Sequence, residues 1–248
     1  MRNGQKTYSR FLAFVALLTC AVLTLRAHAE AGPCKPLEHT EVLICGSGDG
    51  AAIVIGDTTS PSGKLALGWR ATDGPPTEQP DEDSIELLIL RLADGAALYH
   101  AKGSYWDTGE MHVNRLQEKA AWSPNSRFMV RAFHSRFSTD DVDVFALGAD
   151  DKVTGPFDLL KLLDSTARAK LKERVKDTDG YEFFLAGMKD DDKPVTVDNA
   201  GNIVAHVMFW IPKNGPFYYY TVKARTREVN GALDVRIVSI AYRGKQDE

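Results

Sequence analysis

One glycine-rich stretch has the residue types of a nucleotide loop or a nucleophile turn. Gly46-Ser47-Gly48-Asp49-Gly50 resembles a phosphate-binding loop in composition. A dinucleotide site needs a helix directly after the glycines, whose N-terminus holds the pyrophosphate, but the strand-like Ile53-Val54-Ile55 follows. A nucleophile elbow around Ser47 would need glycine at position 45, where Cys45 stands. We therefore interpret this stretch as a turn between two strands.

Histidine and carboxylate side chains provide most hydrolytic and metal sites, and here neither type forms a known signature. The histidines after residue 29 lack metal-ligand spacing: His39, His100, His112, His134 and His206. Acids gather at 140–143, 177–180 and 190–192. A calcium loop beginning at Asp177 would need glycine at 182 and glutamate at 188, where Glu182 and Met188 stand.

From these patterns we predict no catalytic, cofactor-binding or metal-ligating residue. Two alternatives stay open. One is a secreted hydrolase whose site residues converge only in the fold. The other is a structural protein that calcium stabilises through its acidic turns.

Aromatic and basic residues near the C-terminus form the one candidate site. Phe209-Trp210 and Phe217-Tyr218-Tyr219-Tyr220 flank a turn-rich segment. Because side chains alternate along a strand, Phe217 and Tyr219 share a face with Lys223 and Arg225. We predict that these four residues form a surface for a protein or a carbohydrate. The alternative is that a second layer of structure covers the rings.

Asn230-Gly231 predicts the hairpin that carries this surface. A two-residue Asn-Gly turn fixes the register of its strands. The predicted pairs are Val229 with Ala232, Arg227 with Asp234, Ala224 with Ile237 and Val222 with Ser239. One face is then apolar and the other charged, which is typical of an antiparallel sheet packed on one side. Val238 and Ile240 fall on the charged face and break the pattern.

The first 29 residues predict export. Arg2, Lys6 and Arg10 precede the uncharged run 11–25, and Ala27-His28-Ala29 is a small-x-small cleavage pattern. The run has 15 residues, short of the roughly 20 that span a bilayer as a helix. We expect a signal peptide over 1–29 and a periplasmic or extracellular protein that begins at Glu30. The alternatives are an uncleaved anchor and lipidation at Cys20.

Cleavage leaves two cysteines, Cys34 and Cys45, which we expect to form a disulfide in an oxidising compartment. It also removes four basic residues and no acid, so the net charge changes from −4 to −8. An acidic chain with scattered cations gives no reason to expect nucleic acid or anionic lipid as a partner. No second apolar run is long enough to span a membrane.

Hydrophobic patterning over residues 30–248 predicts a single, mainly β domain of antiparallel sheets. From Phe157 to Val175 several apolar residues fall four apart, which predicts a short helical insertion. Asp164-Ser165 can cap its second turn. The expected strands are 42–45, 51–55, 65–69, 85–92, 96–100, 128–133, 142–147, 203–211, 217–226 and 232–242.

Three segments share one form, a turn that leads into an apolar strand. They are Ser60-Pro61-Ser62-Gly63-Lys64, Trp122-Ser123-Pro124-Asn125-Ser126-Arg127 and, more degenerate, Val197-Asp198-Asn199-Ala200-Gly201-Asn202. The second resembles the blade motif of TolB-like β-propeller proteins, with Asn125 and Ser126 in place of the usual Asp and Gly. The resemblance covers about a dozen residues per copy. It implies propeller-like blades, although closed propellers have about four to eight. Without blade ancestry, the segments are ordinary turns.

The leading functional hypothesis is an exported, non-enzymatic binding module. It follows from the lack of site chemistry and from a repeat that resembles a recognition scaffold. The sequence specifies neither the partner nor the oligomeric state.

Overall fold

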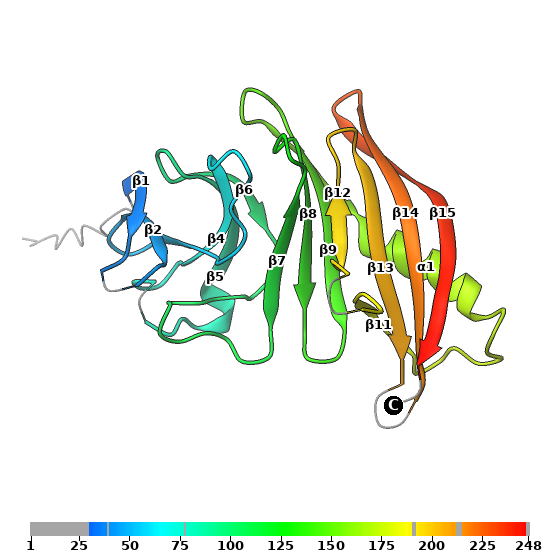
Figure 1. The fold of residues 1–248 in the computed structure, drawn as a ribbon. Coiled ribbons are helices and arrows are strands. Elements are labelled where there is room, and N and C mark those ends of the chain that lie inside the picture. Colours follow the sequence, from blue (N-terminus) through cyan, green and yellow to red (C-terminus); the bar gives the residue numbers. More distant parts are fainter. Residues whose placement is uncertain (1–29, 39, 77, 190–191, 212–214, 247–248) are drawn as a thin grey trace, which may run out of the picture.

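A computed structural model describes residues 30–246 apart from 39, 77, 190–191 and 212–214. The predicted signal peptide, with Cys20, therefore lies outside the described residues. Three antiparallel sheets follow one another in a row (Figure 1). The expected mainly β, antiparallel fold is confirmed.

The first sheet has six strands in the order of the chain. A short 3-10 helix, η1 (Glu82–Ser84), precedes the fifth strand. The strands are β1 (Glu30–Pro36), β2 (Leu43–Ser47), β3 (Ala52–Val54), β4 (Leu65–Ala71), β5 (Ile85–Arg91) and β6 (Ala96–Ala101).

The central and third sheets continue the row. The central sheet has the order β10-β9-β8-β7; the third has β11-β13-β14-β15, with β12 also paired to β13. Their strands are β7 (Gln117–Trp122), β8 (Phe128–His134), β9 (Thr139–Leu147), β10 (Val153–Asp158), β11 (Glu182–Leu185), β12 (Val195–Val197), β13 (Asn202–Trp210), β14 (Phe217–Val229) and β15 (Ala232–Gln246).

Helix α1 (Leu159–Leu171) is the predicted insertion and lies behind β14 and β15 in Figure 1. Its N-cap is Asp158, whose Oδ1 accepts a hydrogen bond from the N–H of Lys161 at 3.0 Å. Asp164 and Ser165 lie inside the helix, so the expected second-turn cap is wrong. The buried residues recur every four positions and form one apolar stripe: Leu159, Leu163, Ala167 and Leu171.

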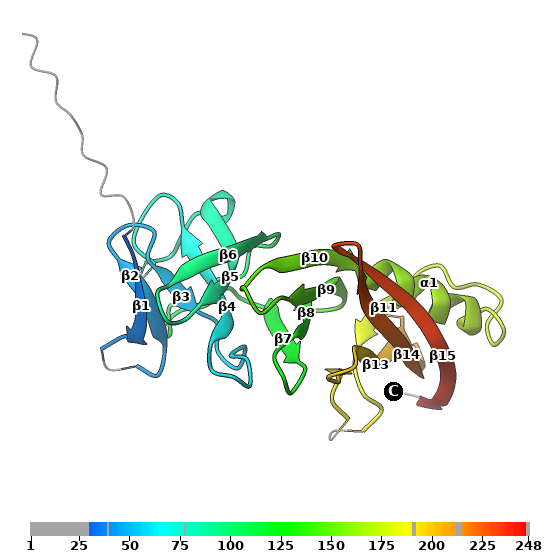
Figure 2. The ribbon, with the colours of Figure 1, turned by 90° about the horizontal axis from the view of Figure 1, so that it is seen from above.

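The central sheet buries apolar residues on both faces because it is the middle layer. One face packs against the first sheet, where Met129 and Phe145 meet Trp69 and Leu67. The other packs against α1 and the third sheet; the central sheet contributes Phe128, Val130, Ala132, Val142, Val144 and Ala146 to that core. Figure 2 shows the same row of layers from above.

The three repeated turns have nearly the same backbone geometry, so the predicted repeat is structural. In each, a residue of positive φ donates its N–H to the carbonyl three positions earlier. The side-chain oxygen of the first turn residue, which is Ser60, Ser123 or Asp198, accepts a hydrogen bond from the N–H of the residue that begins the next strand. This bond spans five residues in the first two turns and four in the third. These backbone hydrogen bonds run from the N–H of Gly63 to the carbonyl of Ser60 (2.9 Å), from Ser126 to Ser123 (2.8 Å) and from Gly201 to Asp198 (3.0 Å).

Each turn leads into the second strand of a four-stranded antiparallel meander. The meanders are β3 to β6, β7 to β10 and β12 to β15. Adjacent turns also contact one another: the N–H of Ser62 donates to Oγ of Ser126 at 3.0 Å, and that of Asn125 donates to Oδ1 of Asn199 at 2.8 Å. In the part of the chain that is described, the row of three meanders does not close into a ring (Figure 2).

The β14–β15 hairpin confirms most of the predicted register and corrects its far end. Asn230 and Gly231 both have positive φ, at 54° and 77°, as a type I′ turn requires. The pairs from the turn as far as Ala224 with Ile237 are as expected. Beyond them a β-bulge adds one residue to β15, so Val222 pairs with Ile240 instead of Ser239.

The bulge also explains the imperfect face pattern. It turns Ile240 towards the core, where it packs beside the buried residues, whereas Val238 is left 66 % exposed. The apolar and charged faces are otherwise as predicted: Tyr220, Val222 and Ala224 are buried, and Lys223 and Arg225 are exposed.

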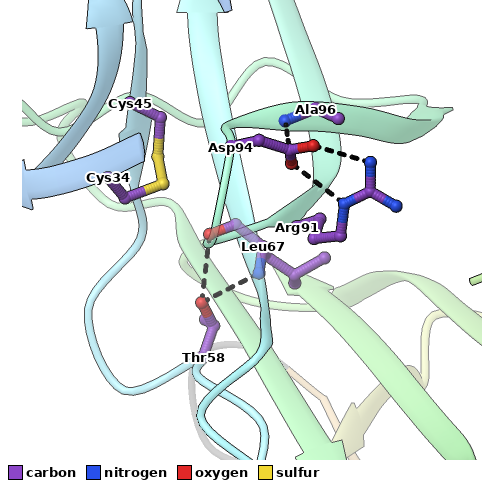
Figure 3. The surroundings of a disulfide bond; sticks show 7 residues. All are labelled: Cys34, Cys45, Thr58, Leu67, Arg91, Asp94 and Ala96. Carbon is purple, nitrogen blue, oxygen red and sulfur yellow. Dashed lines mark hydrogen bonds and ion pairs between the residues drawn. A yellow bond between two sulfur atoms is a disulfide. The ribbon is translucent and has the colours of Figure 1, made fainter. Parts of the chain in front are cut away.

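The disulfide between Cys34 and Cys45 is present and joins β1 to β2, where the two residues are direct strand partners (Figure 3). The bond lies beside the β5–β6 hairpin. There Asp94 accepts hydrogen bonds from the guanidinium of Arg91 at 2.9 and 2.7 Å and from the N–H of Ala96 at 3.2 Å. The disulfide therefore ties β1 to β2, and both cysteines belong to a small apolar cluster with Ala66, Leu88 and Leu90 of the same sheet.

Candidate binding surface

The predicted interaction residues lie on the outer face of the third sheet, the face turned away from α1 and the core. Phe217, Tyr219, Lys223 and Arg225 all lie on this face of β14, as expected from alternation. Phe217 is half-buried, and the two cations are exposed. The outer face has an aromatic end near Phe217 and a basic end near the Asn230-Gly231 turn.

The aromatic end is a ladder of rings drawn from two sheets. Trp210 stacks on Phe217, with ring centres 5.9 Å apart and planes 15° apart. Its indole N–H donates to the carbonyl of Phe137, at the tip of the β8–β9 hairpin, at 3.1 Å. The ring centres of Phe137 and Trp210 lie 6.0 Å apart. The guanidinium carbon of Arg136 lies 4.8 Å from the centre of the Phe137 ring. Sequence reasoning missed Phe137, because it belongs to a different sheet.

Tyr219 is on the predicted face, but it is only 8 % exposed. Its strand partner is Gly244, and a Cβ at that glycine would lie 2.9 Å from the terminal methyl of Met188. The side chain of Met188, which follows β11 in the chain, therefore lies over the outer face at this point. This corrects the expectation of an exposed Tyr219 ring and favours the alternative, in which a second layer covers it. Burial raises the pKa of its hydroxyl.

The basic end contains a shallow hollow of about 450 Å³, which we call the arginine hollow. Arg225 lies directly opposite Arg236 on the neighbouring strand, and Arg227 lies opposite Asp234. Asp234 forms its ion pair with Arg236 of its own strand and not with Arg227; Oδ2 of Asp234 lies 2.9 Å from Nε of Arg236. The hollow is lined by Arg225, Arg227, Val229, Asp234, Arg236 and Val238.

The charge of this end is opposite to that of the chain. With Lys223, the arginine hollow presents four cations and one acid, whereas residues 30–248 have a net charge of −8. Sequence alternation already places Arg227 and Arg236 on this face. The register set by Asn230-Gly231 also places Arg225 opposite Arg236, and the structure has this pair, so two like charges lie on neighbouring strands.

A second hollow, the β7 cleft, has a volume of about 570 Å³ and lies between β7 and the segment before β12. It includes three groups with altered pKa values. Burial raises the pKa of Glu118 to about 7 and that of Tyr105 to about 12, and it lowers the pKa of His134 to about 4.

Each of these groups already has a structural partner. Glu118 pairs with Arg131, Nδ1 of His134 bonds to Oγ1 of Thr139 at 2.9 Å, and the hydroxyl of Tyr105 faces Asp107 at 3.4 Å. Among the described residues, no hydrogen bond joins one of the three to another. The β7 cleft therefore offers a shaped groove but no assembled acid–base pair.

Within the described ranges, no group of three or more His, Cys, Asp or Glu side chains could hold a metal ion. His39, Asp190 and Asp191 lie outside those ranges. No helix among the described residues has the length and apolar character needed to cross a membrane.

Comparison of the chain with models of known protein families and with curated proteins found no match. The function is therefore inferred from the geometry of the outer face of the third sheet and of the β7 cleft.

Proposed function

We propose that this protein is an exported, non-enzymatic binding module that docks an acidic partner protein on the outer face of its third sheet. The observation that carries the proposal is the pairing of Arg225 with Arg236 in the arginine hollow. Like charges directly opposite each other destabilise a sheet. A carboxylate bound between the two guanidinium groups would relieve this repulsion.

The residue types of the hollow suit carboxylates. Arginine presents planar N–H donors that match a carboxylate in bidentate geometry, and its guanidinium is only weakly hydrated. Three arginines around one hollow can therefore bind several carboxylates of one partner. The chain's own net negative charge makes this basic end the part of the surface that attracts an acidic protein.

A protein fits this face better than a carbohydrate does. Val229 and Val238 are 48 % and 66 % exposed at the hollow and offer aliphatic contact area. Sugars stack on open aromatic faces, but Trp210 and Phe217 stack on each other. Arginine and aromatic anchors beside exposed aliphatic groups are typical of protein interfaces.

Export is part of the proposal. It is supported by the signal-like N-terminus and by the disulfide, which persists in oxidising compartments. Mass spectrometry of the protein recovered outside the cytoplasm should show an N-terminus at Glu30. A lipid-modified N-terminus at Cys20 would contradict cleavage after Ala29.

The binding proposal is tested with fluorescently labelled poly-L-glutamate as the probe. Binding should weaken with salt, and the double variant Arg225→Gln/Arg236→Gln should lose about tenfold or more in affinity, since charged hydrogen bonds contribute about 1.5–3 kcal/mol each. The matched control is Lys172→Gln/Lys176→Gln, which removes the same charge from exposed positions beyond α1. An equal loss in the control would show that only net charge matters, and would overturn the proposal.

A second arm replaces the acidic polypeptide with heparin, a sulfated polysaccharide. Tighter, hollow-dependent binding of heparin than of poly-L-glutamate would overturn the choice of a protein partner in favour of an anionic carbohydrate.

A further inference from the structure

The edge of strand β7 is a second recognition element, separate from the outer face of the third sheet. β7 is the last strand on its side of the central sheet and pairs with β8 alone. Among the described residues, no backbone hydrogen bond joins residues 117–122 to any segment other than β8. Every second residue of an edge strand points its N–H and carbonyl away from the sheet, where they can pair with another chain.

The β7 cleft runs along this edge. It is lined by five consecutive residues, Gln117 to Ala121. Successive side chains of a strand point to opposite faces, so a hollow on one face would contact only every second residue. Gly56 and Asp57 line the cleft on the side of the first sheet, and Lys193 and Pro194 line it on the side of the third, so the groove spans the edge of β7 as well as one face. Six strand residues extend about 20 Å, the length of a short peptide segment.

The first sheet shows what an added strand looks like at this position. The repeated turns make β3 and β7 equivalent, since each is the first strand of its meander and precedes the same turn. In the first sheet, β2 pairs with the outer edge of β3, through Ile44 with Ile53 and Cys45 with Ala52. The position that β2 fills beside β3 is unfilled beside β7 in the described part of the chain.

The walls of the β7 cleft indicate the chemistry of its occupant. Ala121, Val130 and Ala132 form an apolar floor, and Leu185 and Val195 line the opposite wall. Lys119 and Lys193 are exposed at the rim. A lysine on an edge strand disfavours pairing with the same edge of a second copy, because the positive charges approach each other. The same lysines favour a segment that carries an acidic side chain.

We propose that the edge of β7 takes up an extended peptide segment of a partner protein, small and apolar in most positions and acidic at one. The segment would pair as a fifth strand of the central sheet, with its acidic side chain beside Lys119 and Lys193. This inference does not rest on the proposed function, because the outer face of the third sheet has no part in it.

The test uses a synthetic peptide, acetyl-Val-Ala-Glu-Ala-Val-Ala-amide, and two N-methylated isomers of it. One isomer is methylated on the first, third and fifth amides, and the other on the second, fourth and sixth. In a paired strand only one of these two sets of N–H groups can face β7. The isomer that is methylated on that set should bind about tenfold or more weakly than the other, because it loses up to three backbone hydrogen bonds. Hydrogen exchange should show new protection at 117–122 when the unmethylated peptide is bound.

A charge variant tests the same site without disturbing the core. Lys193→Glu should weaken binding of the acidic peptide, whereas Lys152→Glu, a matched exposed lysine in another part of the chain, should leave it unchanged. Failure of the peptide to bind, equal affinities for the two isomers, or protection confined to other strands would overturn the proposal. So would protection of 117–122 that appears without peptide as the protein concentration is raised, which would assign the edge to a second copy.

Discussion

The guanidinium of Arg131 on β8 and the carboxylate of Glu118 on β7 form an ion pair inside the protein. Nε lies 2.8 Å from Oε1, and the two side chains are 1 % and 0 % exposed. A second carboxylate, Asp143 on β9, lies 3.0 Å from the same guanidinium. The pair therefore ties the edge strand β7 to the strand that supports it.

Removal of one partner of this pair should be costly. Arg131→Met leaves Glu118 buried without its counter-ion, and we expect the free energy of unfolding to fall by about 3–5 kcal/mol. Denaturant melts give the value, and Glu118→Leu/Arg131→Met should recover part of it. Lys170→Ala, which breaks the exposed pair with Glu173, should cost at most about 1 kcal/mol. Equal effects of the two single variants would contradict the buried role of Arg131.

His134 should contribute stability that is lost at mildly acidic pH, opposite in sign to the contribution of Glu118, whose folded-state pKa is raised to about 7. Burial lowers the pKa of His134 from 6.5 to about 4, so the unfolded chain binds a proton more readily than the folded one. A depressed folded-state pKa contributes stability that is present above pH 6.5 and is lost as the pH falls towards 4. From pH 7 to 5 we expect a loss of about 1–2 kcal/mol from this group.

Melts at both ends of this pH range should show that His134→Gln loses about 1–2 kcal/mol less stability, relative to the parent protein, as the pH falls from 7 to 5. His100→Gln is the matched control, because the side chain of His100 is 55 % exposed. An equal loss in His134→Gln and in the parent protein would show that this imidazole is not the titrating group.

The hairpin turn should be sensitive to its second residue. A β-branched residue resists the φ of +77° at Gly231, so Gly231→Val should cost about 1 kcal/mol or more, although space is open around the glycine. Arg227→Ala should cost little, since no ion pair joins Arg227 to its strand partner Asp234 in the structure. Denaturant melts of both variants decide the matter. The reverse order of stability would count against the register.

Loss of the disulfide should loosen the first sheet. Cys34 and Cys45 are 11 residues apart, and closing so short a loop stabilises a fold by roughly 3 kcal/mol in the chain-entropy model. Non-reducing peptide mapping should recover the two cysteines joined. The reduced protein should melt at a lower temperature than the oxidised protein; two free thiols in the exported protein would refute the bond.

The sequence by itself determined the features that depend on neighbouring residues. Asn230-Gly231 specified a turn, because both residues tolerate positive φ. The turn residues at 60–63, 123–126 and 198–201 specified three nearly equivalent strand starts, because their hydrogen bonds are local. Alternation along β14 assigned Val222 to the core and Lys223 to solvent.

Only the tertiary structure decided the features that depend on distant segments. Strand β7 has the pattern Gln-Glu-Lys-Ala-Ala-Trp, which lacks an apolar alternation, so the sequence predicts no strand there. Its one buried position is Glu118, which is held by Arg131 on another strand. Tyr219 is covered by a segment that alternation along its own strand cannot reveal. A bulge in β15 moved Val222 from Ser239 to Ile240, since register far from a turn is set by packing across the sheet.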